Sequence, residues 1–381
     1  MRIKSKLPNL TESIFSTMSA LAKEYDAINL SQGFPNFETS KELQHLVFKA
    51  MQDGYNQYAP MRGDAELREM IARKIENLYG VKYCSHQEIT ITAGATEAIF
   101  NAVASVITTG DEVLIFKPAF DSYEPVVKLN GGVPVFIQLY YPNYKVDWNL
   151  VASKITHKTK MIIFNSPLNP TGTLFDVQDL LALQNLVTGT NIVVLSDEVY
   201  EHMTYDGQVH KSICEFPVLR EHSFLIASFG KTFHNTGWKI GYCAAPKILM
   251  DEFVKVHEFN VFSINTPYQK AFATFLKDAN NYKYLNTFYQ DKRDLFLEGI
   301  KNSKFTFVPS KGTYFQLLKY DQITDENDVE FAKRLVREFK IATIPISVFN
   351  THFLDEKVLR FCFAKTDETI IKATKILCKI Q

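Results

Sequence analysis

Short apolar, β-rich runs alternate with helical patterns through much of the 381-residue chain, and this alternation restricts the fold more than any other feature. Helical patterns at 96–107, 176–187 and 246–257 separate several of the runs. Near-continuous apolar strands between helices are typical of a mostly parallel sheet covered on both faces. The sequence therefore predicts an α/β fold whose large domain, residues 40–275, is built on a seven-stranded sheet. The runs expected to form its strands are 89–92, 112–116, 133–138, 161–165, 192–196, 223–228 and 240–245.

The remaining sequence has a different texture and predicts a smaller α+β domain formed by residues 1–39 and 276–381. A helical stretch at 13–24 is expected to pack against the C-terminal part. One long helical pattern at 267–301 leads into that part. The segments that follow are β-rich runs at 305–309, 312–318, 342–345 and 358–363, a helix at 328–339 and a final helix from Thr366.

Composition excludes several classes of function. Lys plus Arg and Asp plus Glu both number 42, so no net charge attracts nucleic acid or an anionic membrane. No apolar run approaches the roughly 18 residues of a membrane helix, and the basic N-terminus has no apolar segment behind it. The five cysteines are scattered without a C-x-x-C pair, which argues against zinc and disulfides. We expect a soluble cytoplasmic protein without a metal site.

Two polar turns follow predicted strands. Gly94, Ala95 and Thr96 come directly after the run at 89–92, where small residues and the free amides of a helix start suit an anion such as phosphate. Asn169 lies in a Pro-rich turn, 165–172, after the run at 161–165. Ligands of open α/β sheets bind at such strand ends, which favours a functional Asn169. Taken singly, each turn is also explained as an ordinary strand connection.

Two charged residues follow the next strands. Asp197 comes just after an apolar run, where a carboxylate is unfavourable without a cationic partner such as a protonated ring nitrogen. Lys231 follows the run at 223–228, and a desolvated lysine has the depressed pKa that Schiff-base chemistry requires. Lys239 can supply a permanent charge to a phosphate. A capping aspartate or a surface lysine would explain either residue alone, but the four segments together fit a phosphorylated pyridine aldehyde.

These segments, with 31–37, 56–60, 118–124 and 359–363, resemble the class I (fold-type I) pyridoxal-phosphate-dependent aminotransferases. The likeness is closest to the kynurenine/glutamine-transaminase branch and, within it, to bacterial methionine aminotransferases. It extends from residue 31 to 363, and the stretch 228–242 is its most specific part. The resemblance implies the fold of this family and pyridoxal 5′-phosphate (PLP) as cofactor.

The resemblance also implies a role for each matching residue toward the cofactor. Lys231 would form the Schiff base and carry the proton, and Asp197 would pair with the pyridinium nitrogen. Tyr200 and Asn169 would form hydrogen bonds with the phenolic oxygen of the cofactor ring, and Phe120 would stack on the face of that ring. The residues implied for the phosphate are Gly94, Ala95, Thr96, Ser228, Lys239 and, from the partner of a homodimer, Tyr58.

For the substrate, the resemblance implies that Arg360 binds the α-carboxylate with help from Gly33 and Asn169. The side-chain pocket would contain Phe34, residues 264 and 265 of the partner and, less directly, Tyr314. Aspartate-type members carry Arg where Lys239 stands and recruit another Arg within 260–267, where this chain has none. Dicarboxylic substrates are therefore disfavoured.

Three functions are compatible with these residues. The first is a ping-pong aminotransferase that moves the amino group of a bulky neutral amino acid to a 2-oxo acid. Its expected donors are methionine and aromatic residues, with glutamine and kynurenine as further candidates. The second is a PLP-dependent C–S β-lyase acting on cystathionine or cysteine conjugates, which uses the same residues. The third is a non-catalytic regulator, for which we expect no room because such proteins carry an added DNA-binding domain.

Overall fold

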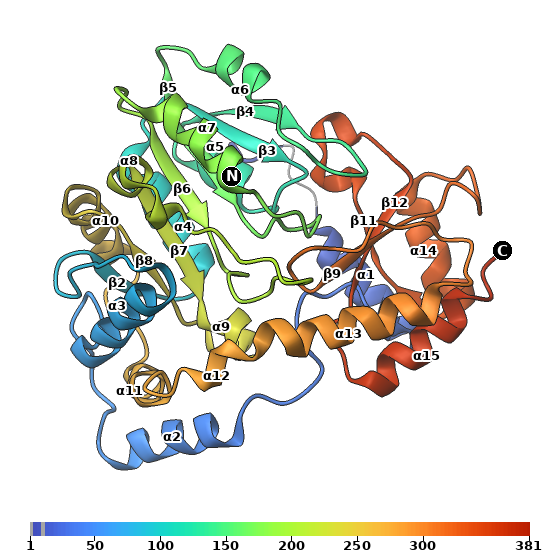
Figure 1. Ribbon diagram of the computed structural model, residues 1–381, viewed down its shortest axis with the longest axis horizontal. Coiled ribbons are helices and arrows are strands. Elements are labelled where there is room, and N and C mark those ends of the chain that lie inside the picture. Colours follow the sequence, from blue (N-terminus) through green and yellow to red (C-terminus); the bar gives the residue numbers. More distant parts are fainter. Residues whose placement is uncertain (1–2, 9–11) are drawn as a thin grey trace.

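The structure is a computed structural model that describes residues 3–8 and 12–381, and its centre is a seven-stranded sheet (Figure 1). The strand order is β2-β8-β7-β6-β5-β3-β4. β7, β6, β5, β3 and β4 run parallel, and β8 is antiparallel to both β7 and β2. The mostly parallel sheet that the sequence predicts is thereby confirmed. The strands are β2 (Ile89–Thr92), β3 (Glu112–Lys117), β4 (Val133–Gln138), β5 (Thr159–Asn165), β6 (Val193–Asp197), β7 (Ser223–Ser228) and β8 (Gly241–Ala244).

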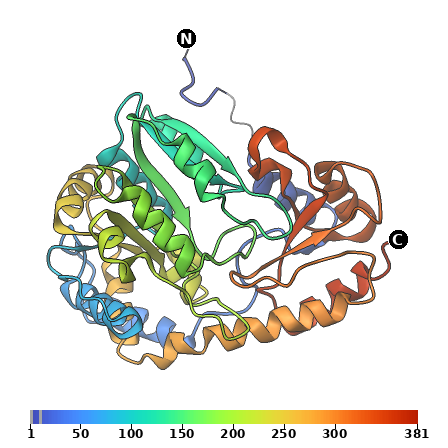
Figure 2. The same cartoon turned by 45° about the horizontal axis from the view of Figure 1, so that its top comes forward.

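Helices cover both faces of the sheet, which is why every residue of its central strands β6 and β7 is buried (Figures 1 and 2). On one face, α4 (Ala95–Val106), α5 (Tyr123–Leu129) and α10 (Lys247–Asn260) enclose a separate apolar core. The remaining helices of this part contribute to the larger core. They are α2 (Lys41–Gln52), α3 (Ala65–Tyr79), α6 (Trp148–Lys154), α7 (Val177–Val187), α8 (Pro217–Glu221), α9 (Phe229–Thr232) and α11 (Thr266–Phe275).

A smaller α+β part combines the two ends of the chain. β1 (Ile28–Asn29) pairs in parallel with β10 (Ile341–Ala342), which joins the N-terminal segment to the C-terminal one. β11 (Ile344–Pro345), β12 (Val358–Cys362) and β9 (Phe315–Lys319) form an antiparallel sheet. The helices of this part are α1 (Ile14–Glu24), α14 (Asp328–Phe339) and α15 (Asp367–Leu377). The proposed boundaries near residues 39 and 275 stay a prediction, and residues 1–2 and 9–11 lie outside the described ranges.

The single long helix predicted at 267–301 is wrong. The chain forms α11, then α12 (Asn280–Lys283) and α13 (Leu285–Ile300). Side-chain caps explain the break: Asp278 accepts from the Asn280 amide, and the Asn281 amide group donates to the Phe275 carbonyl. The β-rich run at 305–309 likewise forms only an isolated bridge, between Thr306 and Lys319.

α13 links the two parts of the molecule and runs from beneath the large sheet to the C-terminal helices (Figure 1). Its far end packs beside α15, and its near end lies close to α9. Within the described residues, no helix is long and apolar enough to cross a membrane.

Candidate active site

A pocket of about 170 Å³ opens at the carboxyl ends of β2, β5, β6 and β7. The parallel strands deliver their following turns to the same edge, so residues far apart in the sequence meet there. Ten of the residues that the sequence predicts for the site line this pocket: Gly94, Ala95, Thr96, Phe120, Asn169, Asp197, Tyr200, Ser228, Lys231 and Lys239. The other lining residues were not predicted: Ile99, Asn165, Val199, Gly230 and Thr236.

Lys231 lies in the short helix α9, directly after β7. Its amine donates to the Gly33 carbonyl and to the Tyr314 hydroxyl, both at 2.9 Å. Burial lowers the pKa of the Lys231 amine to about 8. No carboxylate of the described chain forms an ion pair with it. At pH 7 about a tenth of Lys231 is therefore a neutral, nucleophilic amine, far more than for an ordinary lysine.

Asp197 is the last residue of β6 and is 4% exposed. Its carboxylate accepts from the Tyr123 hydroxyl at 2.6 Å and from the Val199 amide at 3.3 Å. Burial raises the pKa of Asp197 to about 6, against the opposing effect of those two donors. Among the described residues no Lys, Arg or His forms an ion pair with it. The site thus holds a buried acid whose cationic partner must come from a bound molecule.

The start of α4 forms an anion-binding turn. The N-cap Gly94 has φ 77° and no side-chain cap, so the amides of the first turn stay available to a ligand. A Cβ on Gly94 would lie 3.2 Å from the Lys239 amine. A Cβ on Gly241 would lie 3.0 Å from the Gly94 carbonyl carbon and 3.1 Å from the Ala95 amide. Glycine at both positions lets the α4 turn, β8 and Lys239 approach one another closely.

Arg360 extends from β12 of the smaller part and is 1% exposed. Its guanidinium donates to the Asn169 side-chain oxygen at 3.0 Å and to the Ser31 carbonyl at 2.9 Å. It stacks 3.9 Å from the centroid of the Phe315 ring. Its Nε is buried without a hydrogen-bond partner, and Arg360 makes no ion pair within the described ranges. A buried guanidinium with a free donor is suited to a carboxylate ligand.

Behind the pocket, the acids next to Asp197 are fully satisfied. Glu201 pairs with Lys74 at 2.6 Å and accepts from the Tyr79 hydroxyl at 2.7 Å. Burial alone would raise the pKa of Glu201, but the Lys74 charge outweighs it and lowers that pKa to about 2. Glu198 lies 2.8 Å from His210 Nε2 and accepts from the Ile213 amide at 3.0 Å. This network fixes the segment that carries Asp197 and Tyr200.

An exposed aromatic pair, Tyr58 and Phe262, lies outside the pocket. Their side chains are 82% and 46% exposed, and the ring centroids are 5.4 Å apart. Thr266 donates to the Gln57 carbonyl at 2.6 Å, and Ser263 to the Ala59 carbonyl at 2.9 Å. The segments 57–59 and 262–266 are therefore joined in the single chain, and Tyr58 and Phe262 are the large apolar side chains that they expose to solvent.

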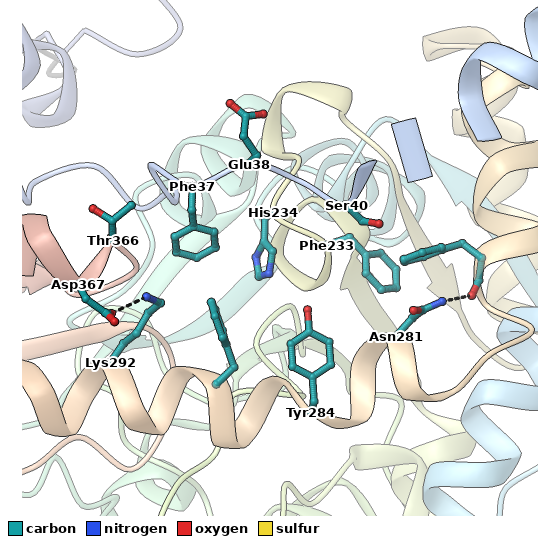
Figure 3. A pocket seen from close by; sticks show the side chains of 12 residues that line it. Phe37, Glu38, Ser40, Phe233, His234, Asn281, Tyr284, Lys292, Thr366 and Asp367 are labelled. Atoms are coloured by element: carbon teal, nitrogen blue, oxygen red, sulfur yellow. Dashed lines mark hydrogen bonds and ion pairs between the residues drawn. The ribbon is translucent and has the colours of Figure 1, made fainter. Parts of the chain in front are cut away.

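A larger cavity, about 450 Å³, lies between the turn at residues 233–234, which follows α9, and α13 (Figure 3). His234 points into it from that turn, opposite α13. Its one lysine, Lys292, already pairs with Asp367 at 3.1 Å and lies 5.1 Å from the centroid of the Phe37 ring. The charged groups suited to a phosphorylated ligand are in the smaller pocket instead.

Comparisons with known proteins agree with this geometry. The family profile described as "Aminotransferase class I and II" matches residues 25–377. A methionine aminotransferase of Escherichia coli is 43% identical over 98% of this chain and 97% of its own. The chain belongs to the class I and II aminotransferases.

Other relatives show the breadth of this family. A Dictyostelium discoideum kynurenine–oxoglutarate transaminase is 34% identical over 97% of this aminotransferase and 94% of its own chain. A solved E. coli structure identified as a methionine aminotransferase is 43% identical, with a TM-score of 0.98 over 100% of both chains. The Thermus thermophilus aspartate aminotransferase with maleate has a TM-score of 0.91 at 28% identity, also over 100% of both chains.

PLP is the cofactor of this aminotransferase, and the residues of the pocket fit it. The unpaired carboxylate of Asp197 suits a protonated ring nitrogen, and the amine of Lys231 suits an aldehyde. The free amides at the start of α4, with Lys239, suit the phosphate. The site needs no rearrangement of its charges to accept the cofactor.

In the single chain the predicted substrate-side residues lie in different surroundings. Ile264 is 5% exposed in the core of its own chain, so its side chain offers little surface to a partner, and its place in the partner's pocket stays a prediction. Phe262, two residues earlier, is 46% exposed. Phe34 is 46% exposed and lines a separate cavity beside Lys365, and Tyr314 is fully buried against Lys231. Asn265 caps α11 by accepting from the Tyr268 amide.

Proposed function

We propose that this aminotransferase transfers the amino group of a bulky neutral amino acid, with methionine and aromatic residues first, to a 2-oxo acid. The observation that carries the proposal is that the Lys231 amine and the unpaired Asp197 carboxylate line one pocket, which Asn169 connects to Arg360. Bound PLP supplies an aldehyde for the amino group and a ring that accepts the electrons of the substrate Cα–H bond. The protein must hold that ring, orient the substrate and move one proton.

The proposed roles follow from chemistry and position. Lys231 would hold the cofactor aldehyde and, when released, would take the proton from the substrate Cα and deliver it to the C4′ carbon of the cofactor. Asp197 keeps the ring nitrogen protonated because its own charge is otherwise unpaired. Tyr200 and Asn169 donate to the phenolic oxygen of the ring, and Phe120 packs on the ring face. Gly94, Ala95, Thr96, Ser228 and Lys239 bind the phosphate.

Arg360 is the proposed site for the substrate α-carboxylate, because it is buried and has a free Nε. Every α-amino acid carries this group, so discrimination must come from elsewhere. The chain has no Arg within 260–267 to accept a second carboxylate. Desolvating an unpaired carboxylate costs several kcal/mol, whereas burying a thioether or aromatic ring gains roughly 25 cal/mol per Å². The names of the E. coli and D. discoideum relatives support the same choice of donors.

A panel of amino acids with a 2-oxo acid acceptor tests this proposal. At about 1.4 kcal/mol per tenfold, methionine or phenylalanine should exceed aspartate by about 10²-fold or more in kcat/KM. Equal use of aspartate would contradict the substrate assignment and leave the cofactor assignment intact. Pyruvate and ammonia formed from cystathionine faster than any transamination product would favour the C–S β-lyase instead.

We further propose a cytoplasmic homodimer in which Tyr58 reaches the phosphate of the partner's site. The exposed Tyr58–Phe262 pair supports the dimer. The five free cysteines of the described chain support the cytoplasm as its compartment. Inactive Lys231→Ala chains mixed with impaired Tyr58→Phe chains should regain activity through hybrid sites. Mixing two preparations of the same variant is the control. A fully active monomer in sedimentation would contradict the dimer.

A further inference from the structure

The Lys231 amine is held by two oxygen atoms that no part of the proposed reaction has yet used. It donates to the Gly33 carbonyl and to the Tyr314 hydroxyl, each at 2.9 Å. The Tyr314 hydroxyl in turn donates to the same Gly33 carbonyl. Amine, phenol and carbonyl therefore form a closed triangle of hydrogen bonds beside the pocket.

This triangle fixes the orientation of the amine as well as its position. A neutral amine has two N–H groups and one lone pair, and a carbonyl can only accept. Burial raises the pKa of Tyr314 well above its ordinary value, so the phenol keeps its proton. With its proton directed to Gly33, the Tyr314 oxygen accepts from Lys231. Both N–H groups of the amine are then engaged, and the lone pair points away from the two oxygens.

The two oxygens are themselves rigidly placed. Tyr314 is fully buried, with its ring edge-on to Tyr200 at 5.2 Å between centroids. Gly33 admits no side chain, because a Cβ there would lie 2.8 Å from the Phe315 ring. Gly33 and Tyr314 come from opposite ends of the sequence, and neither has an acidic group that could trap Lys231 as an ammonium ion.

We propose that Tyr314 is a positioning residue that, with the Gly33 carbonyl, holds the amine of Lys231 whenever it is free and directs its lone pair at the proton to be moved. This rests on the proposed role of Lys231. It assigns Tyr314 to the proton transfer, in contrast to a place in the substrate side-chain pocket. Without its hydroxyl the amine keeps one acceptor and rotates about it, so proton transfer slows while substrate binding is unaffected.

Tyr314→Phe removes the hydroxyl and keeps the ring, and Tyr289→Phe is its matched control. Tyr289 is a buried neighbour, 5.8 Å from Tyr314 between centroids, whose hydroxyl contacts His234 Nδ1 at 2.9 Å and not Lys231. For methionine, Tyr314→Phe should lower kcat about 10- to 100-fold, leave KM within about twofold and increase the isotope effect of α-deuteration. Tyr289→Phe should stay within about twofold on all three.

A second experiment measures the pKa of the Lys231 amine and does not depend on catalysis. The full chain, freed of cofactor, is labelled with trace acetic anhydride across pH, and the Lys231 peptide is quantified by mass spectrometry. Removing an acceptor destabilises the ammonium more than the amine, so Tyr314→Phe should lower the pKa of Lys231 by roughly 0.5 to 1 from the wild-type value of about 8. Tyr289→Phe should not change it.

The outcomes separate this inference from the proposed function. Wild-type kcat and an unchanged Lys231 pKa in Tyr314→Phe would overturn the inference, as would equal effects in Tyr289→Phe. If Tyr314→Phe does not fold, 3-fluorotyrosine at position 314 keeps the ring and the hydroxyl but makes its oxygen a weaker acceptor, and an unchanged Lys231 pKa and kcat there would overturn the inference. Normal turnover by Lys231→Ala would instead remove the role of Lys231 itself.

Discussion

Asp197 and Glu201 are buried acids four residues apart, yet their surroundings are opposite. Glu201, behind the pocket, has Lys74 at 2.6 Å and a pKa lowered to about 2. Asp197, at the pocket wall, has only the neutral donors Tyr123 and Val199, and burial raises its pKa to about 6. Two buried acids in the segment 197–201 therefore have different roles. The acid with its own cation holds the fold, and the acid without one awaits a ligand.

The buried cations Lys74 and Lys231 also differ in whether the protein supplies an opposite charge. Lys74 has its carboxylate inside the protein, whereas Lys231 has only a carbonyl and a phenol. Arg360 resembles Lys231 in this respect, because its partners are the Asn169 side chain and the Ser31 carbonyl. The uncompensated Lys231 and Asp197 line one pocket, which Asn169 connects to Arg360, whereas Lys74 and Glu201 do not line it.

The largest expected effects come from replacing Lys231 and Lys74, each in a separate variant. Lys231→Ala should lose at least ~10³-fold in rate, because the group that moves the proton is gone, while the chain stays folded. The cofactor should no longer be fixed to the chain by borohydride. Lys74→Met should retain the covalent cofactor, yet lose about 3–5 kcal/mol of unfolding free energy because Glu201 is left unpaired. Transaminase assays, mass spectrometry and urea unfolding measure the difference, and normal turnover by Lys231→Ala would refute its role.

The two acids should show the same contrast at a somewhat smaller scale. Asp197→Asn should lower kcat about 10²-fold or more, because the ring nitrogen loses its anionic partner. Glu201→Gln should change kcat far less, but should lower the midpoint of urea unfolding. A near-wild-type rate in Asp197→Asn would mean that the charge of the ring is set by another group.

The pH dependence of stability should have opposite signs for the two acids. Asp197 has a folded pKa of about 6 and an ordinary value of 3.8, so its charge destabilises the cofactor-free fold above pH 6, and this penalty disappears as pH falls to 4. Glu201 goes from 4.5 to about 2, so its stabilisation is present above pH 4.5 and disappears as pH falls toward 2. Each effect is worth up to about 3 kcal/mol. Urea unfolding of Asp197→Asn and Glu201→Gln, each compared with wild type across pH, measures the two effects separately. The comparison removes the contribution of other acids such as Asp328, which is the same in variant and wild type.

The smallest effect should follow from removing one donor to Asp197. Tyr123→Phe deletes the 2.6 Å hydrogen bond that opposes burial, so the pKa of Asp197 should rise above 6. In the cofactor-free chain, the pH profile of urea unfolding should then show the Asp197 penalty disappearing at a higher pH than in wild type. A profile that superimposes on the wild-type curve would show that the Val199 amide alone sets the Asp197 charge.

The fold and ten residues that line the pocket with Lys231 could be predicted from the sequence, because strands and the turns that follow them leave local patterns. Strand periodicity located the sheet; Gly94, Asn169 and Lys231 each follow a strand, and Asp197 is the last residue of one. The side chains that contact Asp197 and Glu201 could not be predicted in this way. Tyr123 and Lys74 lie on helices far away in the sequence, and nothing in their local sequence identifies the acid that each contacts. The break of 267–301 depends on the caps by Asp278 and Asn281, which a helical period cannot reveal. The burial of Ile264 beside exposed Phe262 is likewise set by tertiary packing.

The pairing of β1 with β10 has a consequence for the order of events during synthesis. Every strand of the large sheet has been made when the chain reaches Ala244, and with it every residue that lines the Lys231 pocket. Arg360 follows more than 100 residues later, and β1 has no partner strand until Ile341 is made. At about 5–20 residues per second, the ribosome needs roughly 6–23 s to cover that interval. The nascent enzyme thus completes the sequence of its cofactor pocket well before it can recognise an amino acid.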